Sequence, residues 1–263
     1  MSQLDWIRAA SLAMPGRAQL SHITRIQALG LDFGPMRPFH FTVAGDLHLD
    51  VDQVFLHRTE VLPPCDEVGV SPASAFIQVC ASMRMIDAIK VGDWLLHRRH
   101  MTVLEVAELI RHQRWRPGAA QARQVLQHLD GGARSIKESE VRALFVFAGL
   151  PSPEVNADIF ESDERLGCVD LLYRAWRLAV EYEGRQHAES SEQFRIDIAR
   201  YARFREAGVE YVQVTNEMLG QPRALATLIH RKLRERGYDG PHPVFGRRWN
   251  DLFGTITVRS VKR

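Results

Sequence analysis

The chain has 263 residues, of which 45% are hydrophobic and 25% are charged, and its formal net charge is +2. This length allows one large domain or two modest ones, each able to bury a core. So weak a net charge neither requires nor excludes a nucleic-acid partner, so the local distribution of charge has to decide.

Three cysteines, Cys65, Cys80 and Cys168, are widely spaced and form no C-x-x-C pair. They argue against a disulfide framework or a structural zinc site and fit reduced thiols. The first twenty residues do not have the pattern of a signal peptide, and no apolar run is long enough to cross a bilayer. We therefore expect a cytoplasmic protein without a membrane partner.

The first half of the chain has a mixed pattern. Helical spacing predicts a helix over residues 17–29, with Ser21 as a cap, and aromatic runs at 39–43 and 54–57 predict strands. Further helices are expected at 73–85, 86–97, 102–113 and 119–129. Thr102 and Glu105 have the spacing of a capping box at the start of the third of these.

Asp130-Gly-Gly132 is the clearest internal break, and a different order of elements follows it. We expect a helix at 135–148, strands at 154–160, 167–173 and 177–183, a helix at 191–207, a strand at 209–215 and a helix at 222–236. This αβββαβα order predicts an α/β fold with a mixed sheet flanked by helices. The expected domains are a smaller, mainly helical α+β domain at 1–130 and an α/β domain at 131–263 with a basic tail, in which 254–259 could add a strand.

Three carboxylates fall within one predicted hairpin of the second domain. Glu181 and Glu183 share one strand face, and a four-residue loop at 174–177 would place Asp170 directly opposite Glu181. Carboxylates so close repel each other unless one takes up a proton or a cation lies between them. Mg²⁺ or Mn²⁺ suits this oxygen-rich setting best.

Gly184 and His187 follow the second strand and strengthen this interpretation. Glycine allows close approach of a ligand, and an imidazole at the mouth of a site can move protons near neutral pH. Each residue alone has a simpler explanation, namely a solvated sheet face, an arginine partner for Asp170, or a surface histidine. For the group we favour a site.

The residues around this hairpin resemble a known family. Asp170 followed by Glu181-Tyr-Glu-Gly-Arg-Gln-His187 is similar to the D…E-x-D-G-x-x-H signature of domains related to the very-short-patch repair endonuclease. Those domains belong to the PD-(D/E)xK, or restriction-endonuclease-like, superfamily. Ser135-Ile-Lys-Glu138 with Arg142, Asp197-x-x-Arg200 and Val212-Gln-Val-Thr215 match further parts of the pattern, and together they span about residues 133–238.

The resemblance implies a restriction-endonuclease-like αβββαβ core and specific roles within it. Asp170 and Glu181 would bind the metal together with the Tyr182 carbonyl, and Glu138 and His187 would lie at the edge of the site. Arg200 would face a phosphate or brace a carboxylate, although it could equally pair with Asp197 on its own helix. Glu183 stands where the superfamily has a lysine, which leaves the metal, His187 or Arg200 to assist the reaction, or leaves a weak or inactive site.

The first half resembles, more loosely, the segment that precedes this nuclease domain in AbiEi-like components of type IV toxin–antitoxin systems. The matching residues are Leu20-Ser-His-Ile-Thr24, Ala28-Leu-Gly-Leu31 and Val70-Ser-Pro-Ala73 with Val79. Such proteins typically begin with a winged helix-turn-helix, and we expect no complete one in this chain.

Basic residues gather on the last helices and in the tail. Phosphate contacts of this kind supply affinity without sequence specificity. The candidates for DNA contact are Arg195, Arg200, Arg203, Arg247 and Arg248. A solvated helix face is the alternative, and Trp249 either stacks on a base or packs on the core.

The sequence therefore predicts a Mg²⁺- or Mn²⁺-dependent DNA endonuclease acting in repair or defence on duplex, mismatched or branched DNA. The alternative is an inactive or weakly active nuclease fold that acts as a DNA-binding or antitoxin-like regulator, with a protein partner or as a homodimer. A third hypothesis is another metal-dependent hydrolase reaction.

Overall fold

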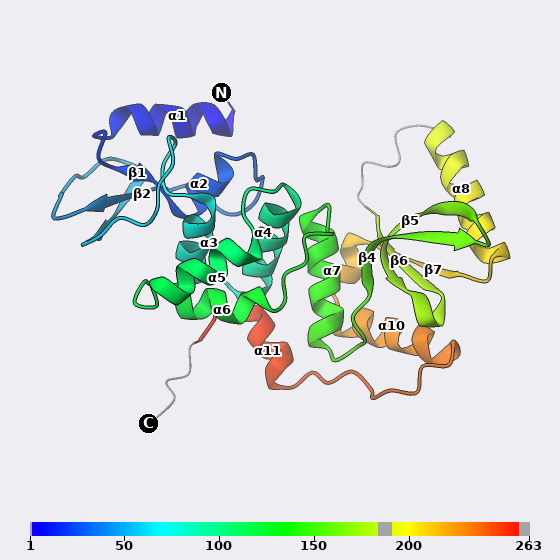
Figure 1. Cartoon of the computed structure of the whole chain (residues 1–263). Coiled ribbons are helices and arrows are strands. Elements are labelled where there is room, and N and C mark those ends of the chain that lie inside the picture. Colours follow the sequence, from blue (N-terminus) through cyan, green and yellow to red (C-terminus); the bar gives the residue numbers. More distant parts are fainter. Residues whose placement is uncertain (1, 184–190, 258–263) are drawn as a thin grey trace. The chain divides into compact units, whose positions relative to one another are not determined.

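The computed structural model describes residues 2–183 and 191–257, and only the backbone of residues 191–198. The chain forms two compact units (Figure 1): unit 1 comprises Met1–Leu129 and Thr255–Arg263, and unit 2 comprises Asp130–Gly254. Each unit combines helices with a mixed sheet, which confirms the α/β class. No helix within the described ranges has the length and apolar character needed to cross a membrane.

Unit 1 is a three-stranded sheet followed by a group of helices. Its elements are α1 (Gln3–Ala13), β1 (Gln19–Leu20), α2 (His22–Gln27), β2 (Phe39–Ala44), β3 (Val54–Thr59), α3 (Pro72–Cys80), α4 (Met85–His97), α5 (Val103–His112) and α6 (Ala119–Leu126). β1 and β2 are antiparallel, and β2 and β3 are parallel. The parallel pair is joined by the segment 45–53.

The predicted helix over 17–29 is wrong in its first turn. Gln19 and Leu20 pair with β2 instead, because Leu20 packs into the core formed by α1 and β2. α2 begins only at His22, and the Ser21 hydroxyl bonds the His22 ring rather than capping the helix. Tertiary pairing has overridden the local helical pattern here.

Other parts of unit 1 follow local rules. Thr102 and Glu105 form the predicted capping box of α5, with Thr102 N–H donating to Glu105 at 2.6 Å. Gly118 begins α6 at φ +90°, and a Cβ there would meet the Ile77 carbonyl oxygen, so only glycine fits. α1, which we did not predict, has its own capping box between Ser2 and Asp5.

Unit 2 has the predicted order of elements with two short additions, α9 and α11. Its elements are α7 (Ile136–Phe147), β4 (Glu154–Glu161), β5 (Glu164–Tyr173), η1 (Arg174–Trp176), β6 (Leu178–Tyr182), α8 (Ser191–Glu206), β7 (Glu210–Val214), α9 (Asn216–Leu219), α10 (Pro222–Glu235) and α11 (Arg247–Phe253). β4, β5 and β6 are antiparallel neighbours, and β7 adds parallel to β6 across the α8 crossover.

Helix α8 packs on one face of this sheet through Phe204, which is fully buried among β-strand side chains. Gly167 permits the contact, because a Cβ there would meet the Phe204 ring at 3.0 Å. Removing a buried phenylalanine side chain typically costs about 3–5 kcal/mol. Phe204 therefore anchors α8 to the sheet about one turn after Arg200 and Tyr201.

The C-terminal part of the chain differs from expectation. Trp249 on α11 is 2% exposed and packs against Phe245 and Phe253, so the core alternative is confirmed for this residue. The tail that the sequence assigned to the second domain contacts unit 1, through a bridge between Arg84 and Thr255. Of the expected strand at 254–259, the described residues form only this isolated bridge.

Candidate functional site

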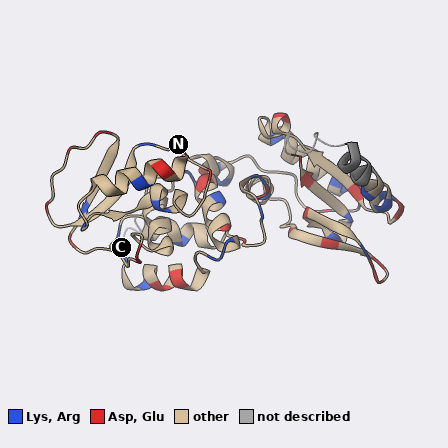
Figure 2. Ribbon diagram, turned by 90° about the horizontal axis from the view of Figure 1, so that it is seen from above, with Lys and Arg blue, Asp and Glu red and all other residues tan. Residues whose placement is uncertain are grey.

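A row of polar side chains crosses the sheet of unit 2. The loop between β5 and β6 spans residues 174–177 as predicted, because Tyr173 pairs with Leu178. The same register pairs Leu171 with Val180 and so brings Asp170 in line with Glu181. Glu181 in turn pairs with Gln213 on β7. Figure 2 shows acidic positions within these strands.

Asp170 lies where β5 and β6 begin to separate. Its Oδ2 accepts the Tyr182 backbone N–H at 2.8 Å. Burial, reinforced by the nearby Glu138 and Glu181 carboxylates, raises the pKa of Asp170 to about 7, against the lowering effect of the Tyr182 bond and Arg200. Asp170 therefore gains or loses a proton near neutral pH.

Glu138 approaches the same point from the first turn of α7. Ser135 caps this helix by accepting the Glu138 N–H at 3.1 Å, which fixes the position of Glu138. The Glu138 carboxylate is buried and accepts from Arg134 N–H at 2.8 Å and from Asn156 Nδ2 at 2.7 Å. Asn156 lies on β4 between the residues that pair with Val169 and Leu171.

Glu181 is held by two donors on its Oε2 atom. Arg200 Nη2 of α8 lies 2.9 Å away, and the Tyr211 hydroxyl of β7 donates at 2.9 Å. Of the two roles expected for Arg200, the structure has the carboxylate brace; the side chain of Asp197, the alternative partner, lies outside the described residues.

Tyr201 and Tyr211 form a wall beside this ion pair. Their rings stack with centroids 4.1 Å apart, and their hydroxyls are hydrogen-bonded at 2.9 Å. Burial and the adjacent Glu181 raise the pKa of Tyr211, so its hydroxyl remains a donor. Sequence reasoning missed both tyrosines, although the register that brings Glu181 to Gln213 also brings Tyr211 beside Ala179 on the same face.

These residues line a cleft of about 480 Å³. Its lining is Arg134, Asn156, Arg165, Gly167, Cys168, Asp170, Glu181, Tyr182, Glu183, Arg200, Tyr201, Tyr211 and Gln213. Glu183 is exposed at its edge and donates its backbone N–H to Val214. The Tyr182 hydroxyl donates to Asn216 at 2.8 Å. Gly184, His187 and the side chain of Arg195 lie outside the described residues.

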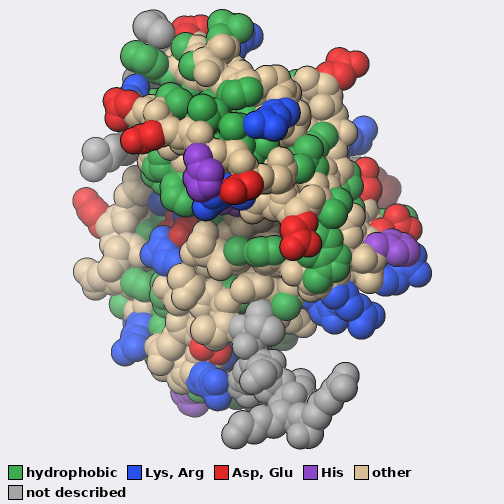
Figure 3. All heavy atoms as spheres, turned by 90° about the vertical axis from the view of Figure 1, so that its left-hand side faces the viewer, with side chains coloured by type: hydrophobic (Ala, Val, Ile, Leu, Met, Phe, Trp, Pro, Cys, Tyr) green, Lys and Arg blue, Asp and Glu red, His purple; other side chains and the backbone are tan. Residues whose placement is uncertain are grey.

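The remaining predicted DNA contacts lie outside the cleft lining. Arg203 is exposed on α8, Arg247 is exposed on α11, and Arg248 stacks over the Phe147 ring at 5.4 Å. On α10, Lys232 pairs with Glu210 at 2.7 Å and Arg231 with Glu235 at 3.8 Å, which offsets part of the basic charge. On the face of unit 1 that Figure 3 shows, basic and acidic side chains are likewise interspersed with hydrophobic ones.

The three carboxylates Glu138, Asp170 and Glu181 converge without forming a tight cluster. Within residues 2–183 and 191–257, only one group of three or more potential metal ligands has donor atoms within 4.8 Å of one another. That group lies in unit 1 and consists of His22, His40 and His57. In the cleft of unit 2, two facing carboxylates match hard cations, which retain several waters.

Comparison with known proteins gives two relatives, both from Mycobacterium tuberculosis. They are the uncharacterized proteins MT2308 of strain CDC 1551 / Oshkosh and Rv2248 of strain ATCC 25618 / H37Rv, each 32% identical over 168 residues. The match covers 63% of this chain and 62% of each relative, so the chain spans less than two thirds of the relatives it matches. No protein-family model and no solved structure matches the chain.

Proposed function

We propose that unit 2 is a metal-dependent DNA endonuclease with a restriction-endonuclease-like core, which hydrolyses phosphodiester bonds with Mg²⁺ or Mn²⁺. The observation that carries the proposal is that Asp170 of β5 and Glu181 of β6 line one cleft, with the buried Glu138 carboxylate of α7 close enough to raise the pKa of Asp170. A raised pKa of Asp170 supports it, because such shifts gather where carboxylates are arranged for function rather than for stability.

The donor set in this cleft fits a hard divalent cation. Asp170 and Glu181 offer carboxylate oxygens from adjacent strands, and Mg²⁺ is typically bound by one or two carboxylates. The raised pKa of Asp170 also means that its negative charge lacks full compensation by the protein. When bound, the ion supplies an activated water and stabilises charge on the phosphate.

The chain's own residues then have distinct tasks. Tyr182 N–H orients the Asp170 carboxylate, and Arg200 with Tyr211 orients Glu181. Arg134 and Arg165 line the cleft and are placed to contact a phosphate backbone. Glu183 cannot replace the superfamily's lysine as a positive charge, so we assign that charge to Arg200, which pairs with Glu181 and whose side chain is 26% exposed.

A second candidate function rests on the same ion pair. Since Glu181 Oε2 already accepts from Arg200 and Tyr211, a cation must compete with these two donors. If Arg200 keeps Glu181 and no metal ion binds, the protein would retain the nuclease fold and use it for binding, as a DNA-binding or antitoxin-like regulator. The replacement of lysine by Glu183 favours the same alternative.

Nicking of supercoiled plasmid by the full chain tests the first proposal. Wild type is compared with Asp170→Asn and Glu181→Gln in Mg²⁺ and in Mn²⁺, at matched protein concentration. Glu161→Gln is the control, because Glu161 is an exposed carboxylate on β4 outside the cleft lining. We expect cleavage by wild type and Glu161→Gln, and its loss in both site variants.

Two other outcomes separate the alternatives. Salt-sensitive DNA binding by wild type without cleavage in either metal would replace the nuclease proposal by the regulatory one. Equal cleavage by wild type, Asp170→Asn and Glu181→Gln would show that the carboxylates are not the site, and that the activity comes from elsewhere.

A further inference from the structure

Three histidines meet on one face of the sheet of unit 1, far from one another in the sequence. His22 begins α2, His40 lies on β2 and His57 on β3. Nδ1 of His40 and Nε2 of His57 are hydrogen-bonded to each other at 2.8 Å, and the rings of His22 and His57 stack with centroids 3.6 Å apart. One nitrogen from each ring lies within 4.8 Å of those of the other two.

The backbone around these rings is held by bonds between the elements that carry them. Ser21 N–H donates to the His40 carbonyl at 3.0 Å, and His40 N–H donates to Thr24 Oγ1 at 2.9 Å. β2 and β3 pair in parallel over six residues, which fixes His40 relative to His57. The fold therefore brings the three histidines together, and the contacts between their rings add to this arrangement.

His22 has an unusual conformation for its place in the cluster. Its φ is +52°, a left-handed value that a residue with a side chain rarely adopts. Its N–H donates to Gln78 Oε1 at 3.1 Å, and its Nδ1 is hydrogen-bonded to the buried Ser21 hydroxyl at 2.9 Å. Because Nδ1 of His22 already has a hydrogen-bond partner, Nε2 is the atom left to bind a metal. Metal-bound histidines commonly have such a partner on their other ring nitrogen.

The chemistry of the three rings suits a transition metal. Imidazole nitrogens are common ligands of zinc and other transition metals. Burial lowers the pKa of His22 to about 2, with contributions from His57 and His40, and that of His57 to about 4, with a contribution from His40. Zinc–nitrogen bonds of about 2.0–2.1 Å at tetrahedral angles separate ligand nitrogens by about 3.3 Å. A bound ion would replace the hydrogen bond between His40 and His57 and widen the separation of these two nitrogens slightly from 2.8 Å.

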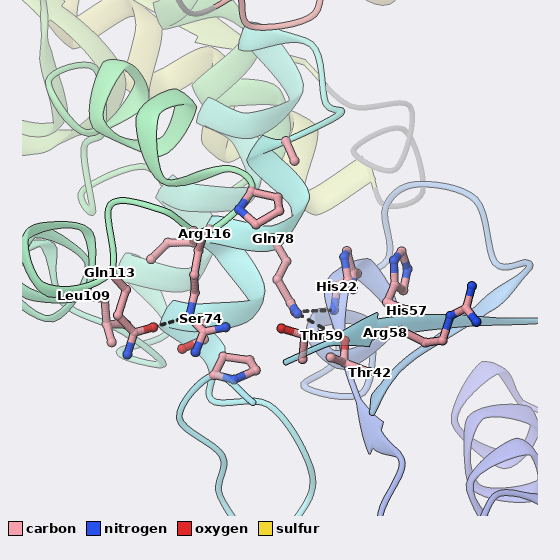
Figure 4. Close-up of a pocket in the computed structure, with 14 residues that line it drawn as sticks. His22, Thr42, His57, Arg58, Thr59, Ser74, Gln78, Leu109, Gln113 and Arg116 are labelled. Carbon is pink, nitrogen blue, oxygen red and sulfur yellow. Dashed lines mark hydrogen bonds between the residues drawn. The ribbon is translucent and has the colours of Figure 1, made fainter. Parts of the chain in front are cut away.

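A cavity of about 150 Å³ lies beside the cluster. It is lined by His22 and His57 together with the polar side chains of Thr42, Thr59 and Gln78, and Figure 4 shows the two histidine rings side by side at its edge. The space is ample for a water molecule, and the hydroxyls and the amide offer it partners. Three protein ligands with an open fourth position are typical of reactive rather than structural zinc sites.

We propose that unit 1 binds one Zn²⁺ through His22, His40 and His57, with a water or a small oxygen ligand in the fourth position facing this cavity. Arg58 lines the cavity, and its charge is offset by Asp46 at 3.0 Å. The proposal is independent of the carboxylate cleft, which lies in unit 2.

Metal binding by the full chain tests it, with Zn²⁺ and Co²⁺ as probes. Chelator-stripped protein is titrated with Zn²⁺, and stoichiometry is measured by elemental analysis after dialysis. Co²⁺ reports the geometry through the visible bands of a tetrahedral ion. The variants are His40→Gln and His57→Gln. The controls are His48→Gln, an exposed histidine in unit 1, Cys65→Ser, an exposed thiol, and Asp170→Asn in the other site.

We expect one Zn²⁺ per wild-type chain, a tetrahedral Co²⁺ spectrum without thiolate bands, and a rise in the melting temperature with Zn²⁺. His40→Gln and His57→Gln should weaken binding at least tenfold, while the three controls bind as wild type does. The wild-type spectrum and stabilisation need no variant, so a variant that fails to fold does not prevent a decision. Binding lost in Cys65→Ser or in Asp170→Asn, or no stoichiometric binding by wild type, would overturn the proposal.

Discussion

The imidazole cluster of unit 1 and the carboxylate cleft of unit 2 are built alike and carry opposite kinds of titratable group. Both place half-buried side chains on neighbouring strands, and both have pKa values shifted by burial towards the neutral form. In unit 1 this shift frees nitrogen lone pairs, whereas in unit 2 it leaves a carboxylate holding a proton near pH 7.

The two sites differ in the cation that their side chains are suited to bind. Imidazole nitrogens suit zinc, and carboxylate oxygens suit magnesium or manganese. Unit 2 also supplies a cation of its own, since Arg200 lies 2.9 Å from Glu181. The comparison therefore predicts two metal sites of different selectivity in one chain. In the carboxylate site, Arg200 competes with the metal ion for Glu181.

The largest effects are expected when each site is mutated separately and both metal-dependent properties are measured in each variant. Asp170→Asn should lower Mg²⁺-dependent cleavage by about 100-fold or more, because a metal ion contributes several kcal/mol to such reactions. The same variant should leave Zn²⁺ stoichiometry unchanged. His57→Gln should do the reverse, as measured by plasmid nicking and by elemental analysis of the same preparations. A single variant that abolishes both properties would show that there is one site and not two.

The pH dependence of stability gives the next largest effect. In metal-free protein the folded-state pKa of Asp170 is about 7, above its ordinary value of 3.8, so the folded state binds the extra proton. Stability from this group is fully present below about pH 4 and is lost as the pH rises through 7. Asp170→Asn should be more stable than wild type at pH 8 by roughly 2–4 kcal/mol, at about 1.4 kcal/mol per pKa unit.

Urea unfolding of wild type and Asp170→Asn in EDTA, at pH 4, 6 and 8, measures this difference. Using the difference removes the opposite contribution of carboxylates such as Glu154 and Asp66, whose pKa values are lowered by arginine and backbone partners. Mg²⁺ at pH 8 should stabilise wild type and not the variant. A difference that is constant with pH would show that Asp170 does not titrate in this range.

The two sites also differ in how far the sequence could reveal them. Asp170, Glu181 and Glu183 occur within one hairpin, so strand alternation and a four-residue loop were enough to predict that Asp170 faces Glu181. The histidines lie 18 and 17 residues apart, on elements that the β1–β2 and β2–β3 pairings help to bring together. Each one looks like an ordinary strand or loop histidine, and no spacing motif connects them.

The same contrast holds for the fold. Capping and turn signals act over a few residues and predicted α5, α6 and the 174–177 loop well. The helix expected at 17–29 was wrong because β2, about twenty residues away, pairs with Gln19 and Leu20. A local pattern contains no information about a partner strand so far along the chain. Because the helix begins only at His22, this residue lies beside the strands.

Removing the Tyr211 hydroxyl tests whether a metal ion competes with protein donors for Glu181. This hydroxyl donates to Glu181 at 2.9 Å, and a hydrogen bond to a charged group contributes about 1.5–3 kcal/mol. Tyr211→Phe should therefore destabilise metal-free protein by that amount. Because one donor to Glu181 is gone, Mg²⁺ should recover more stability in the variant than in wild type. Tyr201→Phe is the matched control, since its hydroxyl is hydrogen-bonded to that of Tyr211, whose own proton goes to Glu181 and is kept in this variant. An equal effect of Mg²⁺ on all three proteins would mean that Glu181 is not a ligand.

The corresponding change in unit 1 should have the smallest effect. Ser21 touches the His22 ring and not the ion, so Ser21→Ala removes only the bond that orients His22. Loss of such an orienting partner typically weakens metal affinity 10- to 100-fold. We expect about tenfold weaker Zn²⁺ binding with the stoichiometry and the tetrahedral Co²⁺ spectrum retained, measured by competition with a chelator of known affinity. Ser11→Ala, an exposed serine of α1 bonded to the Ile7 carbonyl, should bind Zn²⁺ as wild type does. If Ser21→Ala also kept full affinity, the bond from Ser21 would not be needed to orient the His22 ring. The left-handed backbone conformation of His22 would then be sufficient to place the third ligand.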